Sequence, residues 1–247
     1  MATEVLEPTF EVTSAWLIWK LPFAAALIMP GIGKLSKKST GYVAVGFALM
    51  SALSAASLIP LALEAGEVHS QIMWIEALGL KAGVLADPLS IIMANVVGWI
   101  SFLIMIYSTG YMKGDKDITR FWFWMLFFIG SMQLIVLSDN LLQVFFGWEG
   151  VGLASYALIS FWYRDKKKDH VGVEGRTVLG VLDYYSPTHA GMKAFIMTKV
   201  GDVMMIAGML LIFLFAGTFG FKELMGDTDW ATAMAAQGLL VPAFVLL

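Results

Sequence analysis

Six apolar runs, each long enough to cross a lipid bilayer as a helix, constrain the fold more than any other feature of the sequence. A transmembrane helix needs about 20 predominantly apolar residues to cross about 30 Å of hydrocarbon. Runs of this length occupy residues 14–32, 40–63, 88–111, 119–138, 140–163 and 191–217. We therefore predict an all-α integral membrane protein with six complete transmembrane helices.

The composition excludes several classes of protein. Only 14% of the 247 residues are charged, whereas a water-soluble domain has roughly a quarter. The net charge of -3 offers no basic excess for a phosphate backbone, so no nucleic-acid partner is expected. Because the sequence contains no cysteine, this chain cannot form disulfides, thiolate zinc sites or cysteine-ligated iron–sulfur clusters. We expect no redox cofactor in this chain, and any redox centre belongs to a partner.

A seventh apolar run starts near Gln237 and reaches Leu247 after eleven residues. As a helix it would be about 16 Å long, roughly half of a membrane crossing. We expect this run to be the start of a seventh span and the sequence to be the front part of a longer protein.

Positive charges are distributed unevenly between alternate loops. Cytoplasmic loops retain Lys and Arg during membrane insertion. With six crossings, twelve basic residues fall on one side of the membrane and only Lys81 and Lys222 on the other. The twelve are Lys34, Lys37, Lys38, Lys113, Lys116, Arg120, Arg164, Lys166, Lys167, Lys168, Arg176 and Lys193. This asymmetry predicts a multi-pass protein of the cytoplasmic membrane with its N-terminus outside.

Three segments outside the spans have features of their own. Residues 71–85 contain short apolar runs around glycines, which predicts a β-hairpin on the outer face. Residues 164–190 carry three consecutive lysines, which we interpret as a solvated cytoplasmic loop in preference to a lipid head-group site. Residues 221–235 are typical of a short amphipathic helix on the outside.

Three ionisable residues are predicted to lie deep in the membrane, where each costs about 2.5 to 3.5 kcal/mol. Glu149 in the fifth run and Lys199 in the sixth lie about 13 Å and about 12 Å from opposite ends of their helices. Asp202 follows Lys199 by three residues and shares its helix face. Because the two spans are consecutive and antiparallel, Glu149 could face the Lys199–Asp202 pair.

We interpret Glu149, Lys199 and Asp202 as a proton relay. Burial and neighbouring charges bring the proton affinity of such groups into a range where exchange is feasible. A lysine that turns between two carboxylates would then make Glu149 a switchable proton site. The alternative is a passive ion cluster that only holds the helices together.

Three glycines surround Glu149, at positions 147, 150 and 152. Their order is not that of a dinucleotide-binding loop, and no strand precedes them. We favour close helix packing as their role, and a looser helix that admits water to the carboxylate is compatible with it. Trp148 is interpreted as a packing residue.

The remaining polar residues in or near the spans have more ordinary interpretations. Lys20 lies about six residues after the start of the first run and is expected to snorkel to the outer interface. The three histidines, His69, His170 and His189, lie in loops and are too scattered for a metal site. His170 and His189 are candidates to pass protons at the cytoplasmic entry. The aromatic residues 121–124 are expected to pack against lipid.

Two motifs, LSDNLLQVFFGWEGVGLASY at residues 137–156 and MKAFIMTKVGD at residues 192–202, closely resemble subunit L (chain 5) of the respiratory NADH-quinone oxidoreductase. Relatives of that subunit include the large Mrp-type sodium/proton antiporter subunit and membrane subunits of archaeal F420H2 dehydrogenase. The resemblance runs from about Ala86 to Lys222 and is densest in the two motifs.

This resemblance implies an antiporter-like, proton-translocating subunit of an NADH-quinone (or F420H2) oxidoreductase, with an Mrp-type Na+/H+ antiporter subunit as the alternative. Glu149 matches the family's key membrane glutamate, Lys199 its basic partner and Asp202 the acid of its ion pair. The expected partners are the other membrane subunits of the complex and the lipid bilayer. Electron transfer would occur in other subunits, and quinone or methanophenazine would bind elsewhere in the complex.

The resemblance also divides the chain into residues 1–85, with two helices and the outer hairpin, and residues 86–247, the start of the channel domain. The loop at residues 166–190 is longer than in the bacterial subunit, which indicates an archaeal or otherwise divergent relative. The family's central lysine and broken helix would lie beyond Leu247, so we expect that these residues alone cannot pump.

Overall fold

Six long helices lie side by side in a computed structural model that describes residues 9–76 and 80–247. Within that part of the chain, six helices are long and apolar enough to cross a membrane, or seven if a bent pair near the C-terminus counts as one span. The predicted all-α membrane fold with six spans is confirmed. The turn predicted around Gly79 lies outside the described residues.

The spans have the following bounds: α1 (Phe10–Leu35), α2 (Lys37–Ala56) continued by α3 (Ile59–Leu63), α4 (Pro88–Tyr111), α5 (Ile118–Leu137), α6 (Leu141–Ile159) and α7 (Pro187–Ala216). Two differ from the sequence estimate in a way that matters. The second run breaks between α2 and α3, and α6 ends at Ile159 rather than at residue 163.

Side chains in the flanking turns define where the helices begin. The Asn140 side chain accepts from the backbone N–H of Gln143 and caps α6. Asp87 and Ser90 form a reciprocal capping box at the start of α4. Gly217, with φ of 69°, ends α7 in the left-handed conformation that glycine adopts readily.

Neighbouring helices pack in the order expected for short connections. Helix α1 packs against α2 and α5, α5 packs against α6, and α6 packs against α7. A cluster of buried apolar side chains from α1, α2, α4 and α5 fills the first half of the bundle and includes Met29, Met105 and Trp122. Trp122 is fully buried, so the expectation that the aromatic run faces lipid is wrong for this residue.

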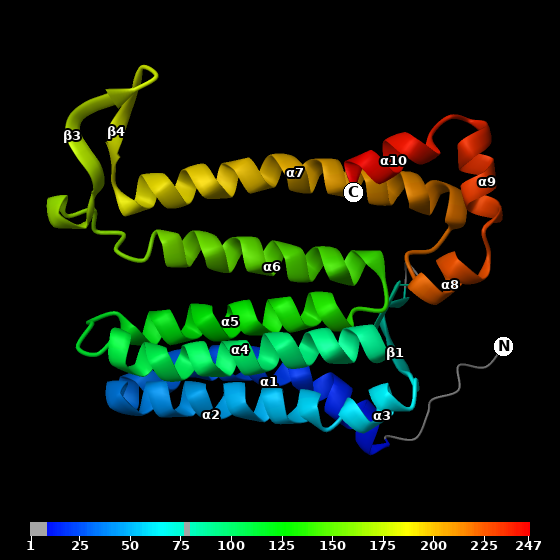
Figure 1. Cartoon of the computed structure of the whole chain (residues 1–247), viewed down its shortest axis with the longest axis horizontal. Helices are drawn as coiled ribbons and strands as arrows, with labels where there is room; N and C mark the ends of the chain where they lie inside the picture. Colours follow the sequence, from blue (N-terminus) through cyan, green and yellow to red (C-terminus); the bar gives the residue numbers. More distant parts are fainter. Residues whose placement is uncertain (1–8, 77–79) are drawn as a thin grey trace.

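Two small antiparallel hairpins cap opposite ends of the bundle (Figure 1). One pairs β1 (Val68–Ile75) with β2 (Leu80–Ala86), which confirms the hairpin predicted there. The other pairs β3 (Val171–Val178) with β4 (Val181–Tyr185). This second hairpin occupies the segment that the sequence had indicated to be only a charged loop.

Beyond α7, three short helices follow. The predicted amphipathic helix is two helices, α8 (Phe221–Gly226) and α9 (Asp229–Ala236), because the chain turns at residues 227–228. The final apolar run forms α10 (Leu240–Leu246), which meets α9 at an angle of 105°. Helix α10 packs against α7.

Candidate functional site

The three ionisable residues predicted from the sequence meet between α6 and α7. The ammonium group of Lys199 contacts Oε2 of Glu149 and lies 2.8 Å from Oδ2 of Asp202. The Asp202 side chain is 6% exposed, while those of Lys199 and Glu149 are 29% and 32% exposed. One base therefore bridges two acids, one of which is nearly buried.

The helices bring these groups together because of their lengths and directions. Glu149 is the ninth residue of the nineteen in α6 and so lies at its middle. Lys199 and Asp202 project from the middle of the longer, antiparallel α7 and share a face at the i, i+3 spacing. The sequence prediction that Glu149 faces the pair is thus met by direct contact.

Trp148 has a role that the sequence analysis missed. Its indole nitrogen donates to Oδ1 of Asp202 at 3.0 Å, so Asp202 is bound through one oxygen by Trp148 and through the other by Lys199. An indole N–H inside a protein usually finds an acceptor. The position of Trp148 directly beside a membrane glutamate was the signal that could have revealed this contact.

The glycines near Glu149 hold α6 close to α5. A Cβ atom at Gly147 would lie 2.7 Å from the Ile135 side chain and 2.9 Å from the carbonyl oxygen of Ser131, and one at Gly150 would collide with the Ser131 side chain. The packing role is confirmed at these two positions. Gly152 faces open space, where a Cβ would meet nothing.

A cavity of about 390 Å³ opens beside the ion cluster, between α6 and α7. Asp202 and Trp148 line it together with the polar side chains of Ser155, Tyr156 and Thr198. These hydroxyl groups extend from the cluster towards the end of the bundle where α6 finishes. Most of the wall is apolar, formed by side chains such as Phe195, Met197 and Met205, so the polar groups for water lie along this one row beside Asp202.

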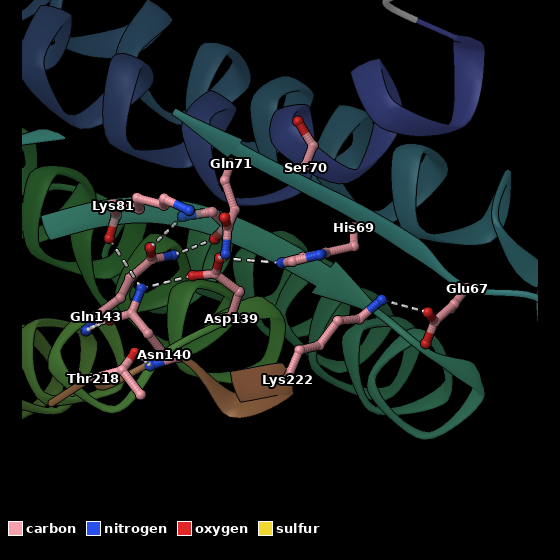
Figure 2. A network of polar contacts seen from close by, with 12 residues as sticks. Glu67, His69, Ser70, Gln71, Lys81, Asp139, Asn140, Gln143, Thr218 and Lys222 are labelled. Carbon is pink, nitrogen blue, oxygen red and sulfur yellow. Dashed lines mark hydrogen bonds and ion pairs between the residues drawn. The ribbon is translucent and has the colours of Figure 1, made fainter. Parts of the chain in front are cut away.

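A second polar network ties the N-terminal end of α6 to its surroundings (Figure 2). The nearly buried carboxylate of Asp139 accepts from the side-chain amides of Gln71, at 2.7 Å, and Asn140, at 2.6 Å, and lies 3.4 Å from Nε2 of His69. The Gln143 side chain exchanges two hydrogen bonds with the backbone of Gly83 in β2. The turn before α6 is thereby fixed to the β1–β2 hairpin.

The same turn is also bound to the chain that leaves α7. The backbone N–H of Leu141 donates to the carbonyl of Phe219 at 3.0 Å, and that of Phe221 donates to the carbonyl of Asp139 at 2.9 Å. Close by, Lys222 pairs with Glu67 at 2.5 Å. No signal in the sequence indicated these partners of Asp139.

The remaining predicted residues lie away from the cluster. The ammonium of Lys20 lies 3.8 Å from the centroid of the Trp16 ring, one turn nearer the start of α1, as a snorkelling lysine would. His170 and His189 stand at the α6–α7 connection, against the rings of Tyr184 and Tyr185. Their suggested part in proton entry stays a prediction.

Two family models match the sequence. Residues 73–122 match "NADH-Ubiquinone oxidoreductase (complex I), chain 5 N-terminus", and residues 138–246 match "NADH:quinone oxidoreductase/Mrp antiporter, TM". These matches extend past both ends of the range expected from the two motifs.

Similar curated proteins include the NADH-quinone oxidoreductase subunits L of Rickettsia conorii, 34% identical over 86% of this chain, and Escherichia coli, 33% identical over 83%. The chain spans about 30% of the length of these relatives, 30% and 31% respectively.

Among solved structures, the membrane-bound sulfane sulfur reductase, an archaeal respiratory membrane complex, superposes with a TM-score of 0.71 at 17% identity, over 94% of this chain and 42% of its own. The Mrp complex from Dietzia superposes with a TM-score of 0.66 at 20% identity, over 94% of this chain and 23% of its own. Both likenesses concern the fold.

Proposed function

We propose that this chain, which belongs to the subunit L (chain 5) family of antiporter-like membrane subunits and matches the N-terminal part of that family, carries part of a proton path through Glu149, Lys199 and Asp202. The complete protein would couple electron transfer in partner subunits of an NADH-quinone or F420H2 oxidoreductase to proton movement across the membrane. This chain itself would carry out no redox chemistry.

The observation that carries this proposal is the ammonium group shared between two carboxylates in the middle of the spans. When Lys199 moves towards Glu149, it favours the ionised carboxylate, and when it moves towards Asp202 alone, Glu149 can accept a proton. The neighbouring cavity reaches the cluster at Asp202 and has Ser155 and Thr198 on its wall, so water there would bring protons to the cluster on the Asp202 side. Each charge moved against 100 mV costs about 2.3 kcal/mol, which the redox reaction supplies.

The proposed orientation follows the basic residues. Twelve of the sixteen Lys and Arg residues lie on the side that contains the α6–α7 connection, so this side would face the cytoplasm and the N-terminus would lie outside. Residues 1–85 would support the channel domain that begins at residue 86. Quinone or methanophenazine would bind elsewhere in the complex.

The alternative is an Mrp-type Na+/H+ antiporter subunit, and the superposition with the Dietzia Mrp complex is the observation in its favour. The two functions differ in what drives proton movement. An antiporter subunit exchanges protons for sodium without an electron donor, whereas the proposed pump moves protons only while electrons flow.

The test uses inverted vesicles that contain the complete complex, with electron transfer and proton uptake recorded on the same sample. We expect E149Q to assemble normally and to lose most of its proton uptake, and E64Q, which alters an exposed carboxylate far from the cluster, to behave as wild type. Unchanged coupling in E149Q would reduce the cluster to a structural role. Sodium-driven proton movement without an electron donor would establish the antiporter instead.

A further inference from the structure

The β3–β4 hairpin ends in an unusual turn. Val178 pairs with Val181, so Leu179 and Gly180 alone form the turn. Both have positive φ, of 51° and 80°, as in a type I′ turn. That turn favours Asn, Asp or Gly at the position that Leu179 occupies, because a bulky side chain is disfavoured in the left-handed region.

Leu179 is also completely exposed. Its relative exposure is 100%, and the flanking Val178 and Val181 are 46% and 55% exposed. Nothing in the described part of the chain compensates for placing three apolar side chains at the end of a projecting hairpin. A leucine that is unfavourable for the turn and unpacked in the fold indicates an apolar environment supplied from outside the described chain.

The lower part of the hairpin and its flanks are basic. Residues 164–193 contain six Lys or Arg and four Asp or Glu. Lys167 lies 3.5 Å from Glu174 and Arg176 lies 3.6 Å from Asp183. The basic side chains of these two pairs are 84% and 62% exposed. Such exposed pairs are weak, so these cations can exchange their carboxylate partners for phosphate groups.

The hairpin lies at the level where a bilayer would end. It runs across the helix axes with its tip level with the ends of the helices (Figure 1). At the same end of the bundle, Trp162 and Tyr163 follow α6 and are both 48% exposed, and such aromatic side chains are typical of the membrane–water interface. The apolar tip is therefore placed at the interface and not in bulk water.

We propose that the tip of the β3–β4 hairpin, residues 178–181, inserts into the interface of the adjacent lipid leaflet, while the basic residues of its lower part bind anionic lipid head groups. The surface area of three apolar side chains at a two-residue turn is far smaller than the area of about 800 Å² that each partner buries in a stable protein interface. Apolar anchors beside lysines are instead the combination by which peripheral segments bind anionic membranes.

The experiment places a nitroxide label at the tip of the hairpin in the full-length protein, within its complex in nanodiscs that contain anionic phosphatidylglycerol. The variant L179C reports on the tip and E174C on the strand below it, and the spectrum of the unsubstituted complex is subtracted. We expect the label at position 179 to be severalfold more accessible to oxygen, relative to a water-soluble nickel chelate, than the label at position 174. In nanodiscs of phosphatidylcholine alone, that difference should decrease.

Three results would overturn the proposal. Equal access of the nickel chelate to both labels would place the tip in water. A label at position 179 that neither reagent reaches would place it against protein. The same depth with and without phosphatidylglycerol would remove the head-group contact.

A second variant separates insertion from folding of the hairpin. L179N suits the turn better than leucine does, so the hairpin should persist. A label at V181C should then move from lipid to water when L179N is added. If the V181C label stays in lipid, the leucine is not the anchor.

Discussion

The indole nitrogen of Trp148 lies 3.0 Å from Oδ1 of Asp202, while the other carboxylate oxygen of Asp202 faces the ammonium of Lys199. Asp202 is therefore held by one neutral donor and one charged donor. Trp148 lies on α6, next to Glu149, and Asp202 lies on α7. The hydrogen bond therefore also joins the two helices that carry the ion cluster.

Replacing Trp148 with phenylalanine should loosen Asp202 without changing the charge of the cluster. A hydrogen bond to a charged group contributes about 1.5 to 3 kcal/mol, and its loss lets Asp202 follow the lysine. We expect W148F to assemble, to couple proton uptake less efficiently and to shift the pH profile of proton uptake. The matched control is W99F, since Trp99 makes no side-chain hydrogen bond within the described residues and is 37% exposed. A W148F profile that overlays that of W99F would contradict this role.

The glycines of α6 give a paired prediction about stability. G147A must push apart α5 and α6, because its Cβ would lie 3.0 Å or less from two backbone atoms of α5, and overpacking of this kind costs about 1 to 3 kcal/mol. G152A points into open space and should be neutral or slightly stabilising. The melting temperature of the detergent-solubilised protein distinguishes the two. Equal melting temperatures would show that α6 does not depend on close contact at Gly147.

The buried carboxylate of Asp139 is expected to stabilise the end of the bundle where the β1–β2 hairpin lies. D139A would remove the acceptor of the Gln71 side-chain amide and leave Asn140 with only its second acceptor, the carbonyl of Lys81. An unsatisfied buried donor costs about 1 to 3 kcal/mol. K222A breaks the exposed pair with Glu67 and should cost less, about 0 to 1 kcal/mol. Thermal unfolding of both variants measures the difference, and a larger loss in K222A would refute the ranking.

The loop after α6 should respond to acid. Hydrogen bonds from Thr188, chiefly from its hydroxyl group, lower the pKa of Asp165 below its ordinary value of 3.8. Because the folded-state pKa is depressed, the stabilisation is fully present above the ordinary value and is lost as the pH falls through the lower, folded-state value. The backbone amide of Thr188 donates to Asp165 at 3.2 Å, so its hydrogen exchange reports on this contact. The protection of this amide from exchange should therefore decrease only at strongly acidic pH. In D165N this extra acid-induced opening should disappear.

The sequence predicted the spans and the ion cluster well because both depend on local rules. The hydrophobic runs determine where helices cross, and the depths of Glu149 and Lys199 follow from helical rise alone. The β3–β4 hairpin was missed because Gly172 and Gly175 interrupt the alternation that indicates a strand, and the pairing shifts register between Gly172 and Thr177. Two partners of Asp139, His69 and Gln71, lie about 70 positions earlier in the sequence, and no local pattern encodes such contacts.

The turn at Asp139 and Asn140 fixes the position at which α6 begins. The N-terminal end of α6 is hydrogen-bonded to the β1–β2 hairpin through Gln143 and Gly83. It is also hydrogen-bonded to the segment after α7 at Phe219. From there an unbroken helix leads to Glu149, and Gly147 and Gly150 seat it on α5. The depth of Glu149 in the bundle is therefore set from two surface segments that lie far apart in the sequence, the β1–β2 hairpin and the chain that enters α8.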